Sequence, residues 1–281
     1  MTLLTSPVAS AAAAGALGVA VGLSLATVWS KRRGSLDTAA RAHPSTVYLV
    51  GAGPGTIDLL TLKGRDLIAS ADVLVCDNLV DETITDLAPH GCQFIDVSKR
   101  GGDKSSTPQE RINEILVAEC KSGRRVVRLK GGDPLIFGRV WPEIQALREA
   151  NCAYELVPGV TSALAAPAAV GIPLTEKTLG RHFTVVSGHK PEELDWQQLG
   201  TAVDTLVIIM GTRKLQTICD SLRTSMSADT PVTIVQWACT AAQKVYTGTL
   251  ETIVSSTAGK TLSPAIIIIG EVARFAKTPK V

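Results

Sequence analysis

Short apolar segments that each end in a polar or glycine-rich turn recur through residues 46–157. The segments are Thr46–Val50, Val73–Cys76, Phe94–Val97, Arg125–Leu129 and Tyr154–Val157. Stretches with helical spacing separate them, so strand and helix alternate along this part of the chain. This alternation predicts an α/β fold with a mostly parallel sheet flanked by helices.

Polar clusters follow four of these expected strands, namely Gly51–Gly55, Asp77, Lys99-Arg100 and Gly131–Asp133. The carboxyl ends of strands in an open α/β sheet meet at a common crevice, where ligands bind. Gly131 and Gly132 permit a positive φ and a close approach of backbone amides to a ligand. Asp133 adds an acceptor for ribose hydroxyls or an amino group. For this stretch taken alone, a tight turn capped by an aspartate is the alternative.

A dinucleotide site is the obvious alternative for the first two turns. Gly51-Ala52-Gly53 after the first strand, with Asp77 after the second, imitates the NAD fingerprint. That fingerprint requires glycine at position 56, where this chain has threonine. Pro54 also interrupts the turn that would cradle a pyrophosphate. The spacing therefore disfavours an NAD-dependent oxidoreductase.

Composition excludes several classes of protein. The six cysteines form no C-x-x-C pair and the four histidines show no metal-ligand spacing, so we expect reduced thiols and no metal site. Residues 1–45 carry four basic residues and one acidic residue, a net charge of +3. Because the whole chain has a net charge of +2, the remaining residues sum to −1. A nearly neutral charge over residues 46–281 does not favour nucleic-acid binding.

Residues 1–45 form a leader unlike the remainder of the chain. Residues 8–29 are uncharged and rich in Ala, Gly, Ser and Val, and Lys31-Arg32-Arg33 follows them. Two interpretations stay open. The segment is a membrane anchor that keeps the rest of the chain on the cytoplasmic side, or an organellar transit peptide for a plastid or mitochondrion. A secretory signal is disfavoured, because the charges follow the apolar run.

Pro158–Ser162 predicts a hinge followed by a helix start, which divides the chain into a first domain, 46–158, and a second domain, 159–281. Expected strands of the second domain are Phe183–Val186, Leu206–Ile209, Val232–Val235, Lys244–Thr249 and Ile266–Ile269. Met210, Cys239 and Ala265 stand at the ends or entrances of these strands. Either they line an adenine pocket or they belong to the core.

Seven segments carry a family resemblance: VGAGPGTIDLLTLKG, ADVLVCDNLV, SKRGG, VVRLKGGDPLIFGR, VPGVTSALAAPAAVGIPLT, IIMGT and SPAIIIIGEV. Together they resemble the uroporphyrinogen-III C-methyltransferases, S-adenosylmethionine-dependent enzymes of the tetrapyrrole methylase family. The resemblance implies two α/β domains, the first sheet mostly parallel and the second mixed, with the cofactor between them, and a homodimer. It implies two successive methyl transfers to uroporphyrinogen III, which give precorrin-2 for sirohaem or cobalamin synthesis.

The resemblance also assigns site residues. It implies that Asp77 is the proton acceptor, that Lys99 is the proton donor and that Arg139 holds the substrate. Further cations near the same edge, Arg100, Lys104, Arg128 and Lys130, are expected to pair with substrate carboxylates. For Arg100 and Lys104 a solvated surface charge is the alternative. The implied contacts of S-adenosylmethionine are Pro54, Gly131, Gly132, Asp133, Ile136, Thr161, Ser162, Met210 and Cys239, with Ala265 as a weaker candidate.

The chain departs from the family pattern at one place. The family usually continues Phe-Gly-Arg with Gly-Gly-Glu-Glu, whereas Val140-Trp141-Pro142-Glu143 follows Arg139 here. Pro142 replaces the first glutamate, and Glu143 matches the second, which we regard as the less critical one. We expect this change to affect catalytic efficiency or the choice of substrate more than the fold. The alternatives are a methyltransferase of the same fold that acts on another tetrapyrrole, and a catalytically weakened binding protein.

Overall fold

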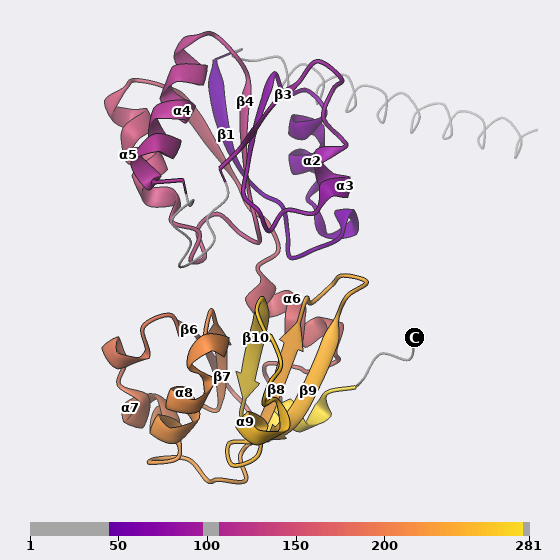
Figure 1. Ribbon diagram of the computed structural model, residues 1–281, viewed down its shortest axis with the longest axis vertical. Helices are drawn as coiled ribbons and strands as arrows, with labels where there is room; N and C mark the ends of the chain where they lie inside the picture. Colours follow the sequence, from indigo (N-terminus) through magenta and orange to yellow (C-terminus); the bar gives the residue numbers. More distant parts are fainter. Residues whose placement is uncertain (1–44, 98–106, 278–281) are drawn as a thin grey trace, which may run out of the picture. The chain divides into compact units, whose positions relative to one another are not determined.

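The structure is a computed structural model that describes residues 45–97 and 107–277 (Figure 1). The predicted leader, apart from Ser45, and the candidate residue Lys99 lie outside these ranges. Residues from Ser45 onward cluster as one compact unit, and the boundary at residue 158 stays a prediction. Within the described ranges, no helix is long and apolar enough to cross a membrane.

The first sheet contains β1 (Thr46–Gly51), β2 (Val73–Cys76), β3 (Gln93–Asp96), β4 (Val126–Lys130) and β5 (Ala153–Val157). The strand order is β3-β2-β4-β1-β5, and every neighbouring pair is parallel. Because β1, β2 and β4 are covered on both faces, they are buried along their whole length. The predicted parallel sheet is confirmed.

Helices cover both faces of this sheet. They are α2 (Leu62–Ile68), α3 (Glu82–Thr85), α4 (Gln109–Lys121) and α5 (Val140–Glu149). Helices α4 and α5 lie on one face, and α2 and α3 on the other (Figure 1). Alternate residues of a strand point to opposite faces, so Val47 and Leu49 pack with α4 and α5, whereas Tyr48 and Val50 pack with α2.

Two helix starts differ from the sequence-based expectation. The spacing of apolar residues predicts a single helix over 58–69. The structure divides it into the 3₁₀ turn η1 (Ile57–Leu59) and α2, because the Thr61 side chain accepts a hydrogen bond from Gly64 N and starts α2 at Leu62. The sequence also predicts a helix over 143–150, whereas α5 starts at Val140. Pro142 therefore lies in its first turn, where a missing N–H leaves no helical hydrogen bond unmade.

The second sheet contains β6 (Phe183–Ser187), β7 (Thr205–Ile209), β8 (Pro231–Gln236), β9 (Lys244–Thr249) and β10 (Ala265–Ile269). Its order is β6-β7-β10-β8-β9. Only β6 and β7 pair in parallel, and the remaining neighbours are antiparallel, which confirms the predicted mixed sheet.

Helices also cover both faces of the second sheet. The helical elements are α6 (Ser162–Ala169), η2 (Pro191–Glu193), α7 (Trp196–Ala202), η3 (Thr212–Lys214), α8 (Leu215–Leu222), α9 (Ile253–Ser256) and η4 (Glu271–Phe275). Ile267 and Ile269 pack with α7, α8 and α9, whereas Ile266 and Ile268 pack with α6 and η4. The consecutive isoleucines of β10 thus serve two separate cores.

Three buried thiols predict a loss of stability at alkaline pH. Burial raises the pKa of Cys76 and of Cys120 to about 12 and that of Cys219 to about 11, from an ordinary value of 9.0. Above about pH 9 these three thiols lose their protons in the unfolded chain, whereas in the native chain they keep them because their pKa is higher. The free energy of unfolding therefore falls by up to about 1.4 kcal/mol per pH unit for each thiol.

Urea unfolding at about pH 8 and about pH 10.5 measures this fall. The variant Cys219→Ala should show a shallower decline, because one of the three groups no longer titrates in the unfolded chain. Stability that stays constant across this interval would contradict the prediction.

Candidate active site

Three loops meet at the carboxyl edge of the first sheet through backbone contacts that admit only glycine. Gly53 N donates to Gly132 O at 3.2 Å, and Gly132 N donates to Gly53 O at 2.7 Å. A Cβ on Gly51 would lie 2.6 Å from Gly132 O, and a Cβ on Gly159 would lie 2.3 Å from the same oxygen. The loops after β1, β4 and β5 are therefore joined into one backbone cradle.

Asp133 holds this cradle together. Its Oδ1 accepts a hydrogen bond from Leu135 N at 2.8 Å, and its Oδ2 accepts one from Gly159 N at 3.0 Å. The carboxylate thus fastens the β4 loop to the residue that follows β5. Each oxygen retains further acceptor capacity toward a ligand. The sequence predicts only the ligand-binding role of Asp133 and does not reveal this clamp.

Thr161 and Ser162 adjoin the cradle at the start of α6. The Thr161 side chain caps that helix by accepting from Ala163 N at 3.3 Å. A Cβ on Gly132 would lie 3.8 Å from both Thr161 Cα and Ser162 N. The structure therefore brings these two residues beside Gly132, as a common binding site requires.

Cys239 joins the first loop to the second sheet. Its carbonyl oxygen accepts from Thr56 N at 3.4 Å and would lie 2.6 Å from a Cβ on Gly55. Its thiol lies 3.7 Å from the carbonyl oxygen of Ala165 in α6. The loop that contains Pro54, the turn after β8 and helix α6 consequently meet at one place.

Met210 and Ala265 stand next to each other at the end of the second sheet. Ile209 pairs with Ile266 across β7 and β10, so Met210 and Ala265 are the next residues on the two strands. Met210 is half exposed. Ala265 pairs with Gln236, at the start of the turn that holds Cys239. The place of Met210 and Ala265 in a cofactor site stays a prediction. Ile136 is exposed in the Asp133 loop, where its N–H donates to Asp133 O at 3.3 Å.

Left-handed backbone is concentrated in these same loops. Within the described residues the non-glycine positions of this kind are Phe137, Arg139, Asn151, Met210, Trp237 and Cys239. All except Asn151 follow strands β4, β7 or β8. A positive φ costs free energy for a residue with a Cβ, and such positions cluster at functional sites. This distribution independently favours a site at the strand ends.

A buried charge network lies beneath the candidate base Asp77. Arg128 Nη2 donates to Asp77 Oδ1 at 2.6 Å, and Arg128 Nε donates to Glu143 Oε1 at 3.2 Å. Lys130 Nζ donates to the same Glu143 oxygen at 2.9 Å. Arg128 is 1% exposed, Lys130 3% and Glu143 0%, whereas the Asp77 side chain is 27% exposed. Only Asp77 of the four presents a substantial surface to solvent.

This network corrects one sequence-based expectation and adds a residue to the description of the charge network. Arg128 and Lys130 are not available to bind substrate carboxylates, because both point into the core and bind Glu143. Glu143 is the acceptor that both buried cations share, a role in the network that the sequence-based interpretation did not assign to it. Its signal in the sequence is its spacing: Val140, Glu143, Ile144 and Leu147 recur on the buried face of α5. An acid within an apolar helical face requires a buried partner.

The network is electrically balanced. Burial disfavours the charge of Arg128, yet attraction by Asp77 and Glu143 holds its pKa above the usual range. Burial and the neighbouring Arg128 charge lower the pKa of Lys130, and Glu143 opposes that shift. Arg128 is therefore a permanent cation beside Asp77. The other catalytic candidate in the described ranges, Arg139, is exposed immediately before α5.

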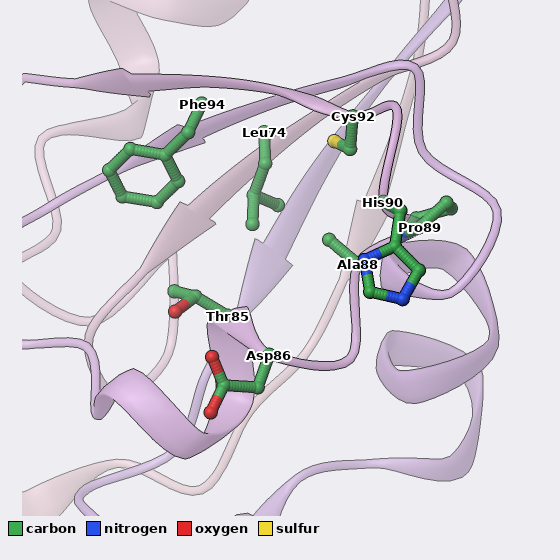
Figure 2. A pocket seen from close by; sticks show the side chains of 8 residues that line it. All are labelled: Leu74, Thr85, Asp86, Ala88, Pro89, His90, Cys92 and Phe94. Atoms are coloured by element: carbon green, nitrogen blue, oxygen red, sulfur yellow. The ribbon is translucent and has the colours of Figure 1, made fainter.

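A surface hollow beside strands β2 and β3 of the first sheet is lined by none of the predicted site residues. Figure 2 shows it between α3, the loop that precedes β3, and strands β2 and β3. Its lining includes Leu74, Asp86, His90 and Phe94. Among the described residues no group of three or more His, Cys, Asp or Glu side chains could hold a metal ion. We find no reason to place the chemistry in this hollow.

Comparison with known proteins defines the family. Residues 46–254 match the profile described as Tetrapyrrole (Corrin/Porphyrin) Methylases. The chain belongs to this family. A Synechococcus elongatus protein named uroporphyrinogen-III C-methyltransferase is 46% identical over 232 residues, which is 82% of this chain and 95% of that protein. A Salmonella schwarzengrund siroheme synthase is 43% identical over 233 residues, which is 82% of this chain and 50% of that protein.

Solved structures of this tetrapyrrole methylase family share the fold. The Thermus thermophilus uroporphyrin-III C-methyl transferase, complexed with S-adenyl homocysteine, superposes with a TM-score of 0.70 at 37% identity. The match covers 82% of this chain and 99% of that one. The family resemblance seen in the sequence is confirmed.

Proposed function

We propose that this tetrapyrrole methylase transfers two methyl groups in succession from S-adenosylmethionine to uroporphyrinogen III and forms precorrin-2. The single observation that carries the proposal is the Gly51, Gly132 and Gly159 cradle clamped by Asp133. It lies in a chain that matches named uroporphyrinogen-III methyltransferases over most of their length. The reaction would supply sirohaem or cobalamin synthesis.

The cradle suits a nucleotide-like cofactor. The absence of a Cβ at Gly51 and Gly159 lets the three loops meet backbone to backbone, and Asp133 presents an acceptor beside them. When bound, S-adenosylmethionine supplies an electrophilic methyl group on its sulfonium. The residues Pro54, Gly131, Ile136, Thr161, Ser162, Met210, Cys239 and Ala265 would complete the site. Fixing methyl group and acceptor carbon in line lowers the barrier by several kcal/mol.

Asp77 would accept the proton that the methylated macrocycle must lose. Arg128 binds Asp77 Oδ1, and the Asp77 side chain remains 27% exposed, which supports access of a substrate to this carboxylate. A carboxylate within hydrogen-bond reach of the substrate is a competent general base. Arg139 would pair with a substrate carboxylate, and Lys99 is the proposed proton donor.

Incubation of the full chain with uroporphyrinogen III and methyl-labelled S-adenosylmethionine tests this function. We expect two labelled methyl groups in each tetrapyrrole product, detected by mass spectrometry. Label found only with a different tetrapyrrole would support the alternative substrate and overturn the assignment to uroporphyrinogen III. An absence of label in any tetrapyrrole would refute the proposal.

Replacing Asp133 by alanine should weaken cofactor binding. The change removes both hydrogen bonds of the clamp and an acceptor for the ligand, a loss of about 1.5–3 kcal/mol in binding free energy. Calorimetric titration with S-adenosylhomocysteine measures it. Asp133→Asn keeps one acceptor oxygen, so its dissociation constant for S-adenosylhomocysteine should lie between those of the wild type and Asp133→Ala. An unchanged dissociation constant for Asp133→Ala would remove Asp133 from the site.

We also propose that the chain acts as a homodimer and that residues 1–45 direct its location. A fusion of residues 1–45 to a fluorescent reporter distinguishes the two interpretations of that leader. These are organellar targeting and membrane attachment through residues 8–29. Import into an organelle with loss of the leader supports targeting. Retention of the leader in a membrane fraction supports anchoring. Sedimentation of the purified chain measures the oligomeric state.

A further inference from the structure

We propose that Glu143 is a positioning residue for methyl transfer, which acts through Arg128 to fix the direction of the Asp77 carboxylate. This inference rests on the proposed function, in which Asp77 removes a proton from the substrate. Glu143 itself is fully buried and does not reach the open side of the loop. Its effect on the reaction must therefore pass through the side chains that it binds.

The Arg128 guanidinium is held on every side. Its Nη1 donates to Leu129 O at 3.1 Å and to Val75 O at 3.4 Å, and its Nε donates to Glu143 Oε1 at 3.2 Å. Because the guanidinium is planar and rigid, these contacts determine where the remaining arm, Nη2, points. That arm meets Asp77 Oδ1 at 2.6 Å. Loss of the Glu143 contact would free the plane to rotate.

Glu143 also prevents competition between two buried cations. Its Oε1 accepts from Arg128 and from Lys130. Without that charge, Asp77 would be the remaining anion of the network for both cations, and either could draw its carboxylate away from the substrate side. A buried charge that loses its partner is strongly unfavourable, so such a rearrangement is expected.

A second feature separates this role from simple core stability. Glu143 Oε2 is buried without a hydrogen-bond partner among the described residues. An apolar side chain at this position of α5 would avoid the desolvation cost of that oxygen. The neighbours Val140, Ile144 and Leu147 make the same face of the helix apolar. The fold thus maintains a costly carboxylate at a position that reaches both Arg128 and Lys130.

A double-mutant cycle between Glu143→Gln and Asp77→Asn tests the inference. In single-turnover assays with labelled S-adenosylmethionine, E143Q alone should lower the methylation rate by about 10- to 100-fold, because a small misplacement of a catalytic group is sufficient for such a loss. The KM for S-adenosylmethionine should change by less than about twofold, because the cradle is untouched. In the D77N background, E143Q should cause no further loss.

Multiplicative losses in the double variant would overturn the inference, because they would show that Glu143 acts independently of Asp77. Glu155→Gln is the matched control and should leave the rate unchanged, because Glu155 of β5 forms only a surface ion pair with Lys63 of α2. If E143Q does not fold, Arg128→Lys replaces it in the double-mutant cycle with Asp77→Asn. Lysine keeps the positive charge but lacks the planar guanidinium that binds both carboxylates. If the wild-type chain has no activity on uroporphyrinogen III, the proposed function is overturned as well. If the wild type is active and the losses of the two single variants multiply in the double variant, only this inference is overturned.

Discussion

Asparagine at position 77 is expected to lower kcat by about 10²- to 10⁴-fold, the contribution of a general base, while S-adenosylmethionine still binds. The amide keeps the size of the carboxylate but cannot accept a proton from the substrate. It also weakens the bond to Arg128, whose charge then loses part of its compensation. Steady-state methylation, together with titration of S-adenosylhomocysteine, separates the loss of turnover from any loss of binding.

Asp86→Asn provides the matched control for this prediction. Asp86 is exposed at the end of α3, nine residues after Asp77, and the bonds of the charge network among the described residues do not include it. Its replacement should leave kcat within about twofold. Full activity in D77N would show that another group removes the proton and would end the catalytic assignment of Asp77.

Alanine at position 159 should disrupt the cradle. The new Cβ would lie 2.3 Å from Gly132 O and 2.8 Å from both Gly51 Cα and Gly51 C, all of them backbone atoms that cannot turn aside as a side chain can. Overpacking of this kind costs about 1–3 kcal/mol or more. We expect a lower thermal midpoint and a decrease of at least about tenfold in affinity for S-adenosylhomocysteine, because three ligand-facing loops must separate.

Gly91→Ala is the control for this substitution. Gly91 is exposed in the loop before β3, and no heavy atom lies within 4 Å of the position that its Cβ would take. It should leave both the thermal midpoint and the affinity unchanged. A Gly159→Ala variant that binds S-adenosylhomocysteine normally would show that the contact of the three loops is not needed for the site.

Much of the fold could be predicted from local patterns. The β-branched runs of β1 and β2 are apolar on both faces, as expected for parallel strands that helices cover on both sides. The turns that hold Gly51, Asp77 and Gly131–Asp133 follow β1, β2 and β4 directly, so their shared edge follows from the direction of the strands. The boundaries of α2 and α5 were less accurate, because a single cap at Thr61 and a proline in a first turn decide them.

The roles of the charged residues could not be predicted in the same way. Arg128 and Lys130 alternate with Val127 and Leu129, so the sequence shows that the two cations share one face of β4. It does not show that α5 covers that face or that Glu143 comes opposite them. A charge at a strand end suits an exposed contact with a substrate equally well, and only the docking of the helix distinguishes the two.

The amino-acid sequence by itself determined the α/β class, the order of the strands along the chain and the loops that carry the chemistry, because these depend on side-chain periodicity and on glycine positions close together in the chain. Tertiary structure alone decided that Asp133 reaches Gly159 N and that Glu143 binds Arg128 and Lys130 beneath Asp77. These pairs join separate elements, and the free energy of a buried charge depends on partners that the packing of the chain brings to it.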